Sequence, residues 1–182
     1  TDDFLFYNQH HNGEKKRFKI RLRTYSSTNQ SFFEIKIKNN KDRTVKKRLL
    51  INETKDALGE DEKDMVSEII GLPSNQYTPK LNIEFFRITL TDNNFNERIT
   101  IDTNLSIKNG AGSKTFDQLV ISEIKQNKYN PKSDFIKILR DLNIQEMRFS
   151  KYCMGVLHLN DNVKYNRFKP RLLRINKILT QT

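Results

Sequence analysis

Hydrophobic and charged positions alternate in several segments of the first third of the chain. Between residues 17 and 25, phenylalanine, isoleucine and leucine occupy even positions, while lysine and arginine occupy odd ones. Residues two apart point to the same face of a β-strand, so such a segment has one apolar and one charged face. The pattern predicts a meander of antiparallel strands joined by polar turns, at residues 4–7, 17–25, 32–38 and 45–51.

The remainder of the chain mixes helical and strand-like patterns. Apolar residues at helical spacing predict a helix over 53–70, closed by Gly71 and Pro73. A second helix is expected to start at Pro131, and a basic helix beyond Pro170. Further strands are predicted at 80–90, 98–102 and 119–125, with a glycine-containing loop at 109–113. The combination indicates an α+β domain rich in antiparallel sheet.

Cations recur on the charged faces of these strands. They are Lys19, Arg21 and Arg23, then Lys36 and Lys38, then Lys46 and Arg48. A strand with alternating polar residues usually has only a solvated face, but such faces normally mix both signs of charge. The first row is cationic throughout, which favours a polyanionic ligand. If the strands close into a barrel, the charged side faces inward.

Composition limits the classes of partner and compartment. The 182 residues carry 33 Lys and Arg against 22 Asp and Glu, a formal charge of +11, so phosphates, nucleic acid and an anionic membrane surface are all compatible partners. The single cysteine, Cys153, excludes an internal disulfide framework and is typical of a reducing compartment. No apolar run approaches the length of a membrane span, and we expect an intracellular protein.

Standard catalytic motifs are absent from the sequence. It has no GxxxxGK[ST] loop, no GxGxxG after a strand and no HExxH, and His10, His11 and His158 lack the spacing of metal ligands. Two Glu-x-Lys pairs in strands, Glu34 with Lys36 and Glu123 with Lys125, each place a carboxylate beside a cation. Such a carboxylate could hold a divalent metal that bridges phosphates, or it could form a structural salt bridge.

Six short segments carry a resemblance to a known family. In order they are KIRLRTY, FFEIKIK, VKKR, ERITIDTNL, ISEIK and FSKYC. Together, from Thr1 to beyond Tyr152, they resemble the VTC domain of the triphosphate tunnel metalloenzyme (CYTH-like) superfamily, whose eukaryotic members polymerise polyphosphate at the vacuole. The resemblance implies an antiparallel β-barrel with flanking helices, in which basic residues line a tunnel and the triphosphate of a nucleotide binds inside.

The resemblance also implies roles for individual residues. Arg21 and Arg23 match the paired tunnel arginines, and Glu123 matches the metal-binding glutamate. The residues to which we assign catalytic charge neutralisation are Arg21, Arg23, Lys36, Lys46, Arg87, Arg98 and Lys151. Phosphate binding is assigned to Lys19, Arg48, Lys125, Ser150 and Tyr152, and metal binding to Glu123 and Glu34. Phe85 departs from the family, which usually has a tyrosine there, so one hydroxyl contact to phosphate would be lost.

The resemblance further implies a domain organisation. We expect a VTC-like tunnel domain over residues 1–165 and a basic C-terminal helix or tail, packed on that domain, over 166–182. The family's N-terminal strand with its own Glu-x-Lys-type motif, a helix and a further strand would precede Thr1 and complete the tunnel wall.

The function that we expect is a polyphosphate polymerase, dependent on Mn²⁺ or Mg²⁺, that transfers the terminal phosphoryl group of ATP to polyphosphate or pyrophosphate. A tripolyphosphatase or another organic triphosphate hydrolase on the same fold is the first alternative. A non-catalytic module that binds polyphosphate or nucleic acid is the second, although phenylalanines that alternate with the cations should face the buried side and offer no stacking surface. We expect a cytoplasmic location, or the cytoplasmic face of a membrane with a membrane-bound partner or domain outside residues 1–182.

Overall fold

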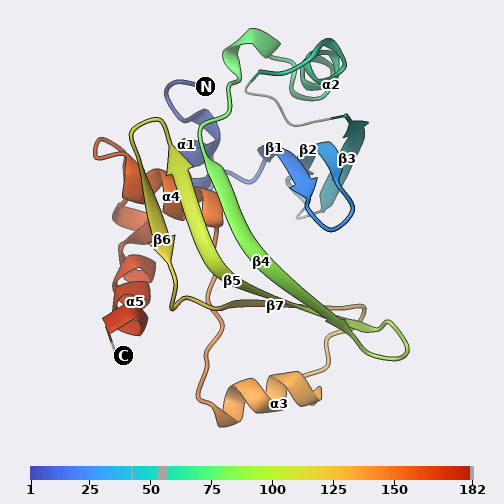
Figure 1. Ribbon diagram of the computed structural model, residues 1–182, viewed down its shortest axis with the longest axis vertical. Helices are drawn as coiled ribbons and strands as arrows, with labels where there is room; N and C mark the ends of the chain where they lie inside the picture. The colour runs from blue at the N-terminus through green and yellow to red at the C-terminus, as the bar shows by residue number, and fades with distance from the viewer. Residues whose placement is uncertain (42, 53–56, 181–182) are drawn as a thin grey trace. The chain divides into compact units, whose positions relative to one another are not determined.

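The computed structural model describes residues 1–41, 43–52 and 57–180 and divides the chain into two compact units, whose elements are labelled in Figure 1. The first unit comprises Thr1–Lys80 and Lys164–Arg167, and the second comprises Leu81–Val163 and Phe168–Thr182. Elements of the first unit are α1 (Leu5–Asn12), β1 (Arg17–Tyr25), β2 (Gln30–Lys38), β3 (Thr44–Ile51), α2 (Glu60–Ile70) and η1 (Ser74–Gln76). The later elements are β4 (Asn82–Thr91), β5 (Glu97–Asn109), β6 (Gly112–Phe116), β7 (Ile121–Gln126), α3 (Asp134–Asp141), α4 (Lys151–Leu159), η2 (Asn166–Phe168) and α5 (Lys169–Thr180).

The first unit contains an antiparallel sheet in the order β1-β2-β3, which confirms the last three strands of the predicted meander. Its apolar face packs on α2 and on Tyr77, with Phe33, Ile35 and Val66 fully buried at the centre. Burial of this face is the main favourable term that holds the sheet, because apolar area removed from water stabilises by about 25 cal/mol per Å². The opposite face is thereby left for the charged side chains.

The prediction of a strand at residues 4–7 is wrong, because this segment begins helix α1. Tyr7 and His11, one helical turn apart, are both buried, and the Tyr7 hydroxyl donates to the carbonyl of Lys164. Gly13, in the left-handed conformation, ends the helix. A run of four apolar residues is compatible with either a strand or a buried helical turn. Burial of Tyr7 and His11, which are four positions apart, is the spacing of a helix.

The helix predicted over 53–70 is shorter in the structure. Residues 53–56 lie outside the described residues, 57–59 are not helical, and α2 begins after Gly59, whose extended backbone marks the cap. The acidic residues Glu60, Asp61 and Glu62 occupy the first turn, where negative charge is favourable near the helix N-terminus. Likewise, the helix expected from Pro131 begins at Asp134, because the Ser133 hydroxyl accepts the Ile136 N–H over 3.4 Å as the cap.

The second unit contains an antiparallel sheet in the order β4-β5-β6, with β7 also paired to β5. Strand β5 extends well past the predicted end at residue 102, and β6 was not expected at all. The sequence of β6 is polar apart from Phe116, so it lacks the alternation that indicates a strand. The observed structure is therefore α+β with antiparallel sheets, as predicted. Hydrogen bonds join the described strands into two sheets and do not close either sheet on itself, so the predicted barrel is not confirmed and stays a prediction.

A β-bulge explains why β5 differs from its sequence pattern. Between the pairs Glu84–Ser106 and Phe86–Thr103, one residue of β4, Phe85, lies opposite two residues of β5, Asn104 and Leu105. Asn104 takes a left-handed φ of 52°. Asp102 and Leu105, three positions apart, therefore share one face. A plain alternation would place Leu105 with Ile101 instead.

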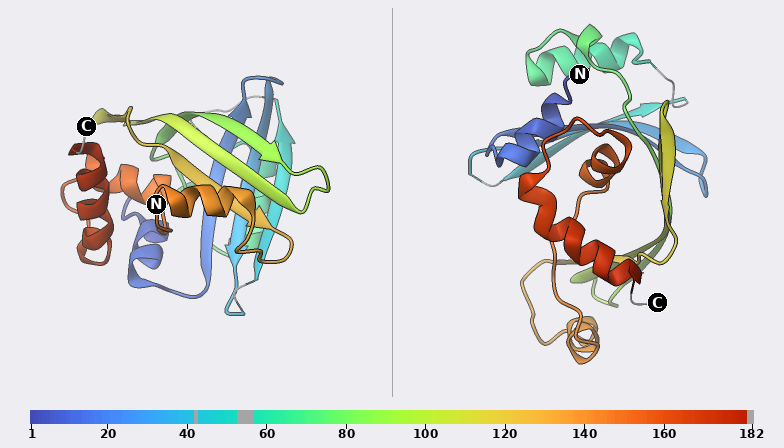
Figure 2. Two further views of the ribbon diagram at one scale, coloured as in Figure 1. Left: turned by 90° about the horizontal axis from the view of Figure 1, so that it is seen from below. Right: turned by 90° about the vertical axis from the view of Figure 1, so that its left-hand side faces the viewer.

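Because of the bulge, a single face of the second sheet is charged at one end and apolar at the other. Helices α4 and α5 cover this face (Figure 2), and Leu105, Ile107, Phe116 and Leu119 form the buried core beneath them. Gly155 of α4 permits the close approach, because a Cβ there would lie 2.6 Å from Ile107 Cγ2.

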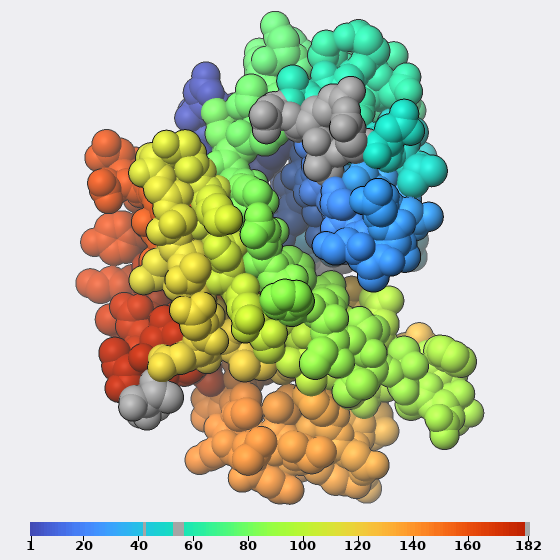
Figure 3. Space-filling model, viewed as in Figure 1, coloured from blue at the N-terminus to red at the C-terminus, as the bar shows by residue number. Residues whose placement is uncertain are grey.

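The other face of this sheet, toward the viewer in Figure 3, leaves apolar side chains of β4 (green) in solvent: Phe86 is 70% exposed, Ile88 56% and Leu90 47%. Helix α5 matches the basic helix expected beyond Pro170, while the predicted domain boundary at 165/166 stays a prediction. None of the helices in the described part of the chain is both long enough and apolar enough to cross a membrane.

Candidate functional site

Cations of three neighbouring strands gather on one face of the sheet in the first unit. The register pairs Lys19 with Lys36 and Lys36 with Lys46, and it places Arg21 and Arg48 on either side of Glu34. Cross-strand partners point to the same face, so the side chains of this sheet that we assigned to the site from the sequence lie together. We call this the first charged face; it consists of Lys19, Arg21, Arg23, Glu34, Lys36, Lys46 and Arg48.

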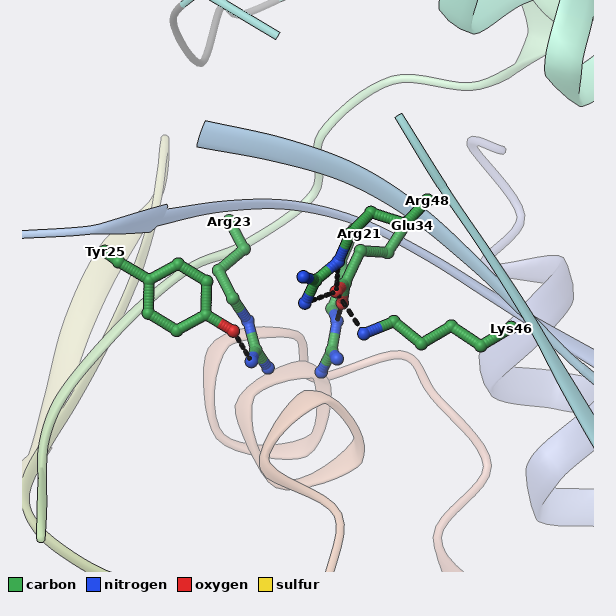
Figure 4. Close-up of polar contacts among 6 residues, drawn as sticks. All are labelled: Arg21, Arg23, Tyr25, Glu34, Lys46 and Arg48. Carbon is green, nitrogen blue, oxygen red and sulfur yellow. Dashed lines mark hydrogen bonds and ion pairs between the residues drawn. The ribbon is translucent and has the colours of Figure 1, made fainter. Parts of the chain in front are cut away.

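Glu34 lies at the centre of the first charged face and binds three cations from the flanking strands (Figure 4). Its side chain is 1% exposed. Oε1 accepts from Lys46 Nζ over 2.5 Å and from Arg48 Nε and NH2 over 2.9 and 2.8 Å, and Oε2 accepts from Arg21 Nε. Glu34 thus serves as an ion-pair centre, and its role as a metal ligand stays a prediction.

These contacts decide the protonation state of Glu34. Burial alone would raise the pKa of its carboxyl, but the hydrogen bonds from Lys46, Arg48 and Arg21 outweigh burial and lower it to about 2. The pKa of Arg21 is lowered, first by its own burial and then by the neighbouring Arg23 guanidinium. An arginine stays charged under such a shift, so the face keeps an excess of positive charge at neutral pH.

Two aromatic rings share the first charged face with the cations. The Arg23 guanidinium donates to the Tyr25 hydroxyl over 2.8 Å, and Arg48 lies 4.2 Å from the ring centroid of Phe32. The expectation that the phenylalanines all face the buried side is therefore wrong for Phe32, because even positions of β2 point toward the cations. Phe33 is buried as predicted. Arg48 lies over the ring of Phe32, where a nucleic-acid base would have to stack.

The sheet of the second unit carries a second group of predicted residues. Asp102 of β5, 3% exposed, accepts two hydrogen bonds from Arg87 of β4, over 2.6 and 2.7 Å, and one from Lys151 at the start of α4. The ring of Phe85 lies 4.3 Å from Lys151 Nζ and 5.1 Å from the Arg87 guanidinium carbon. The phenyl ring of Phe85 thus contacts both cations.

Three more predicted residues lie on the same face of this sheet. Arg98 is paired with Lys125 across β5 and β7, and Thr100 with Glu123. Glu123 and Lys125 form an ion pair of 3.3 Å in which both side chains are half exposed. We call this the second charged face; it consists of Arg87, Arg98, Thr100, Asp102, Glu123 and Lys125, with Lys151 bound to it.

The residues that flank Lys151 are placed by the helix start. The Ser150 hydroxyl accepts the Cys153 N–H over 3.4 Å and so caps α4. Tyr152 follows Lys151 on the helix, where successive side chains diverge by about 100°. Burial raises the pKa of the Tyr152 phenol to about 12, so it stays protonated and able to donate. Phosphate contacts by Ser150 and Tyr152 stay predictions.

Two residues of the second charged face were missed by sequence reasoning. Asp102 binds both predicted cations, and Thr100 is buried with a hydroxyl that has no hydrogen-bond partner among the described residues. The signal was available, because Arg98, Thr100 and Asp102 occupy alternate positions of one strand. Only the arginine was assigned, since an acidic residue in a basic row suggests no phosphate contact by itself.

Comparison with known families agrees with the sequence motifs. A family model described as the VTC domain matches residues 1–160. The chain belongs to the VTC domain family. This family is linked to polyphosphate metabolism, and both charged faces of this VTC domain lie within the matched residues. No curated protein and no solved structure matches the chain.

Proposed function

We propose that this VTC domain is a polyphosphate polymerase, which transfers the terminal phosphoryl group of ATP to a growing polyphosphate chain. The observation that carries the proposal is the first charged face, in which rows of cations from adjacent strands surround a single buried acid. Repeated positive charge on a rigid sheet matches a ligand whose negative charge is also repeated. Family membership supports a polyphosphate-related function.

Phosphoryl transfer requires positioning and charge neutralisation more than covalent participation by the protein. In the proposed reaction the arginine guanidiniums bind phosphate oxygens in a bidentate manner, and the lysines neutralise the negative charge that remains. The neutralising residues are Arg21, Arg23, Lys36, Lys46, Arg87, Arg98 and Lys151. Further phosphate contacts come from Lys19, Arg48, Lys125, Ser150 and Tyr152.

Glu34 contributes indirectly to phosphate binding in this proposal. It shares its carboxylate among Arg21, Lys46 and Arg48, and so keeps three like charges close together. A guanidinium has five N–H donors and an ammonium has three, so each cation retains donor capacity beyond its bond to Glu34.

The oxygen donors near Glu123 fit a divalent cation of the Mg²⁺ or Mn²⁺ type. Glu123 is 56% exposed. Thr100 lies opposite it on β5, and its hydroxyl has no hydrogen-bond partner in the part of the chain that the structure describes. Such cations are commonly held by one or two carboxylates together with substrate phosphates and water. The described residues contain no cluster of three or more His, Cys, Asp or Glu for a metal, so substrate and water would supply the other ligands. When bound, the cation would neutralise phosphate charge.

The direct test is phosphorus NMR of the protein incubated with ATP and Mn²⁺, with and without pyrophosphate as primer. Growth of the internal-chain phosphate signal is the expected result. Release of orthophosphate alone would instead indicate a triphosphate hydrolase, and saturable triphosphate binding without turnover would indicate a binding module. Glu123→Gln should abolish metal-dependent turnover with the circular dichroism spectrum unchanged; retained activity would remove Glu123 from the mechanism.

In this proposal the partners are ATP and polyphosphate or pyrophosphate, with no nucleic acid. A cytoplasmic location, and a membrane-bound partner or domain, belong to the same proposal. The phosphorus NMR experiment does not depend on either of them.

A further inference from the structure

Asp102 connects three elements of the second unit. Its carboxylate on β5 accepts two hydrogen bonds from Arg87 of β4, from Nε to Oδ1 and from NH2 to Oδ2. Oδ2 also accepts a hydrogen bond from Nζ of Lys151 on α4. At 3% exposure, the carboxylate would be unfavourable without such partners, since a buried unpaired charge loses its hydration. The two cations thus keep Asp102 ionised: burial would raise the pKa of its carboxyl, but the bonds from Arg87 and Lys151 lower it.

The same contacts fix the positions of the two cations. Arg87 is held by its bidentate pair and by the ring of Phe85, and Lys151 by Asp102 and the same ring. Lysine side chains are otherwise free to adopt many rotamers, and the loss of that freedom on binding a ligand is unfavourable. Holding the cations before a ligand arrives removes part of this cost.

The charge balance leaves the cations able to act on an anion. One carboxylate faces two positive groups, so the cluster keeps a net positive charge. Asp102 also uses only part of the donor capacity of a guanidinium and an ammonium. Glu34 on the first charged face is likewise a buried carboxylate surrounded by cations, three in its case. The cations of Asp102 come from a helix start as well as from a strand.

We infer that Asp102 is a positioning residue, which holds Arg87 and Lys151 ready to bind the oxygens of a triphosphate group. This inference rests on the proposed function. It assigns to Asp102 a role through other residues, since its carboxylate would repel phosphate if it touched it directly.

The charge state of Lys151 gives the inference a measurable signature. Burial lowers the pKa of Lys151 and so does Arg87, whereas Asp102, and more weakly Glu123, raise it, with a net lowering. Removing the charge of Asp102 therefore lowers this pKa further. Lys151 would then lose its proton, and with it its attraction for phosphate, at a lower pH than in the wild type.

The experiment is calorimetric titration with inorganic tripolyphosphate between pH 6 and 9.5, on the wild type, Asp102→Asn, Asp102→Glu and Glu84→Gln. We expect Asp102→Asn to weaken binding about tenfold at pH 7, a typical effect of losing a charge-assisted hydrogen bond. The alkaline loss of affinity should also begin at a lower pH. Asp102→Glu should recover part of the affinity and the wild-type pH profile. The ionisation of tripolyphosphate itself is common to all variants.

Glu84→Gln is the matched control. Glu84 also forms an ion pair on this sheet, 3.6 Å from Lys108, but both groups are exposed and neither belongs to the second charged face. This variant should bind tripolyphosphate as the wild type does. A loss equal to that of Asp102→Asn would overturn the inference, because any carboxylate of the sheet would then have the same effect.

The outcomes separate the inference from the proposed function. If the wild type does not bind tripolyphosphate, the proposed function fails and the inference falls with it. Wild-type binding with unchanged affinity and pH profile in Asp102→Asn would overturn the inference alone. If circular dichroism shows that Asp102→Asn does not fold, Asp102→Glu decides, because its carboxylate is displaced by one methylene. Unchanged affinity in that variant would contradict the positioning role.

Discussion

Arg21 and Arg48 bind different oxygens of one buried carboxylate from the two strands that flank β2. Arg21 donates to Oε2 of Glu34, and Arg48 donates to Oε1 over 2.9 and 2.8 Å. Like charges on neighbouring strands normally repel and destabilise a sheet. The shared anion offsets that repulsion, so the first charged face can concentrate cations that a plain sheet surface would not tolerate.

Glu34→Gln should destabilise the protein in a pH-dependent manner. The folded-state pKa of Glu34 is about 2, against an ordinary value of 4.5, so its contribution is fully present above pH 4.5 and is lost as the pH falls through 2. We expect a difference in unfolding free energy of about 2 kcal/mol at pH 7 that shrinks toward zero near pH 2. Urea denaturation at a series of pH values measures it, and a difference independent of pH would contradict the prediction.

Lys46 and Lys47 provide a matched pair for testing which face of the first sheet binds phosphate. They are adjacent on β3 and carry the same charge, but Lys46 is opposite Lys36 and belongs to the first charged face, while Lys47 is opposite Ile35. Lys46→Gln should weaken tripolyphosphate binding about fivefold at low salt, since it removes a charge near the ligand. Lys47→Gln should change the affinity less than twofold. Equal losses would mean that only net charge matters.

Gly155→Ala should destabilise the second unit. The added Cβ would lie 2.6 Å from Ile107 Cγ2 and 2.7 Å from Leu81 Cδ1, so either these side chains or α4 would have to shift. Overpacking of this kind costs about 1–3 kcal/mol, which exceeds the gain of roughly 1 kcal/mol from alanine's helix propensity. Gly110→Ala, with no atom within 4 Å of the new Cβ, is the control. Equal unfolding midpoints in urea for both variants would refute the close packing.

Thr100→Val should leave stability unchanged or raise it by about 1 kcal/mol, because the Thr100 hydroxyl is buried without a hydrogen-bond partner among the described residues. Thr24→Val is the contrasting variant. Thr24 Oγ1 lies 2.8 Å from Ser31 Oγ, and its loss would deprive the buried serine of this partner, at a cost of about 1 kcal/mol. Thermal unfolding compares the two; a marked destabilisation by Thr100→Val would mean that the hydroxyl has a partner after all.

The sequence predicted the first sheet well because each of its strands keeps a strict alternation and its turns are polar. It failed in β5, where Ile99, Ile101, Leu105 and Ile107 all occupy odd positions and indicate a single apolar face. The register divides them between two faces at Asn104. A bulge depends on the pairing of two strands, and one strand's pattern does not contain that information.

The candidate site was likewise predicted in part. Rows of cations are visible within single strands, so Arg21, Arg23, Lys46 and Arg48 could be assigned directly. The acids that organise them act across strands or across long stretches of chain: Lys151 and Asp102 are 49 positions apart. Whether a carboxylate binds a metal ion or pairs with lysine and arginine depends on such neighbours. The spacing of Glu34 from Lys36 alone did not distinguish these two roles.

The bulge at Asn104 also determines how β5 can change in length. A chain that lacked this one residue would pair Phe85 with Leu105 and keep every side chain on its present face, as a plain antiparallel ladder. Loss of a single residue between Arg98 and Asp102 would instead turn Arg98 toward the face that bears Phe86 and Ile88. Deletion of Asn104 should therefore be tolerated, whereas deletion of a residue between Arg98 and Asp102, a few positions earlier in the same strand, should be harmful.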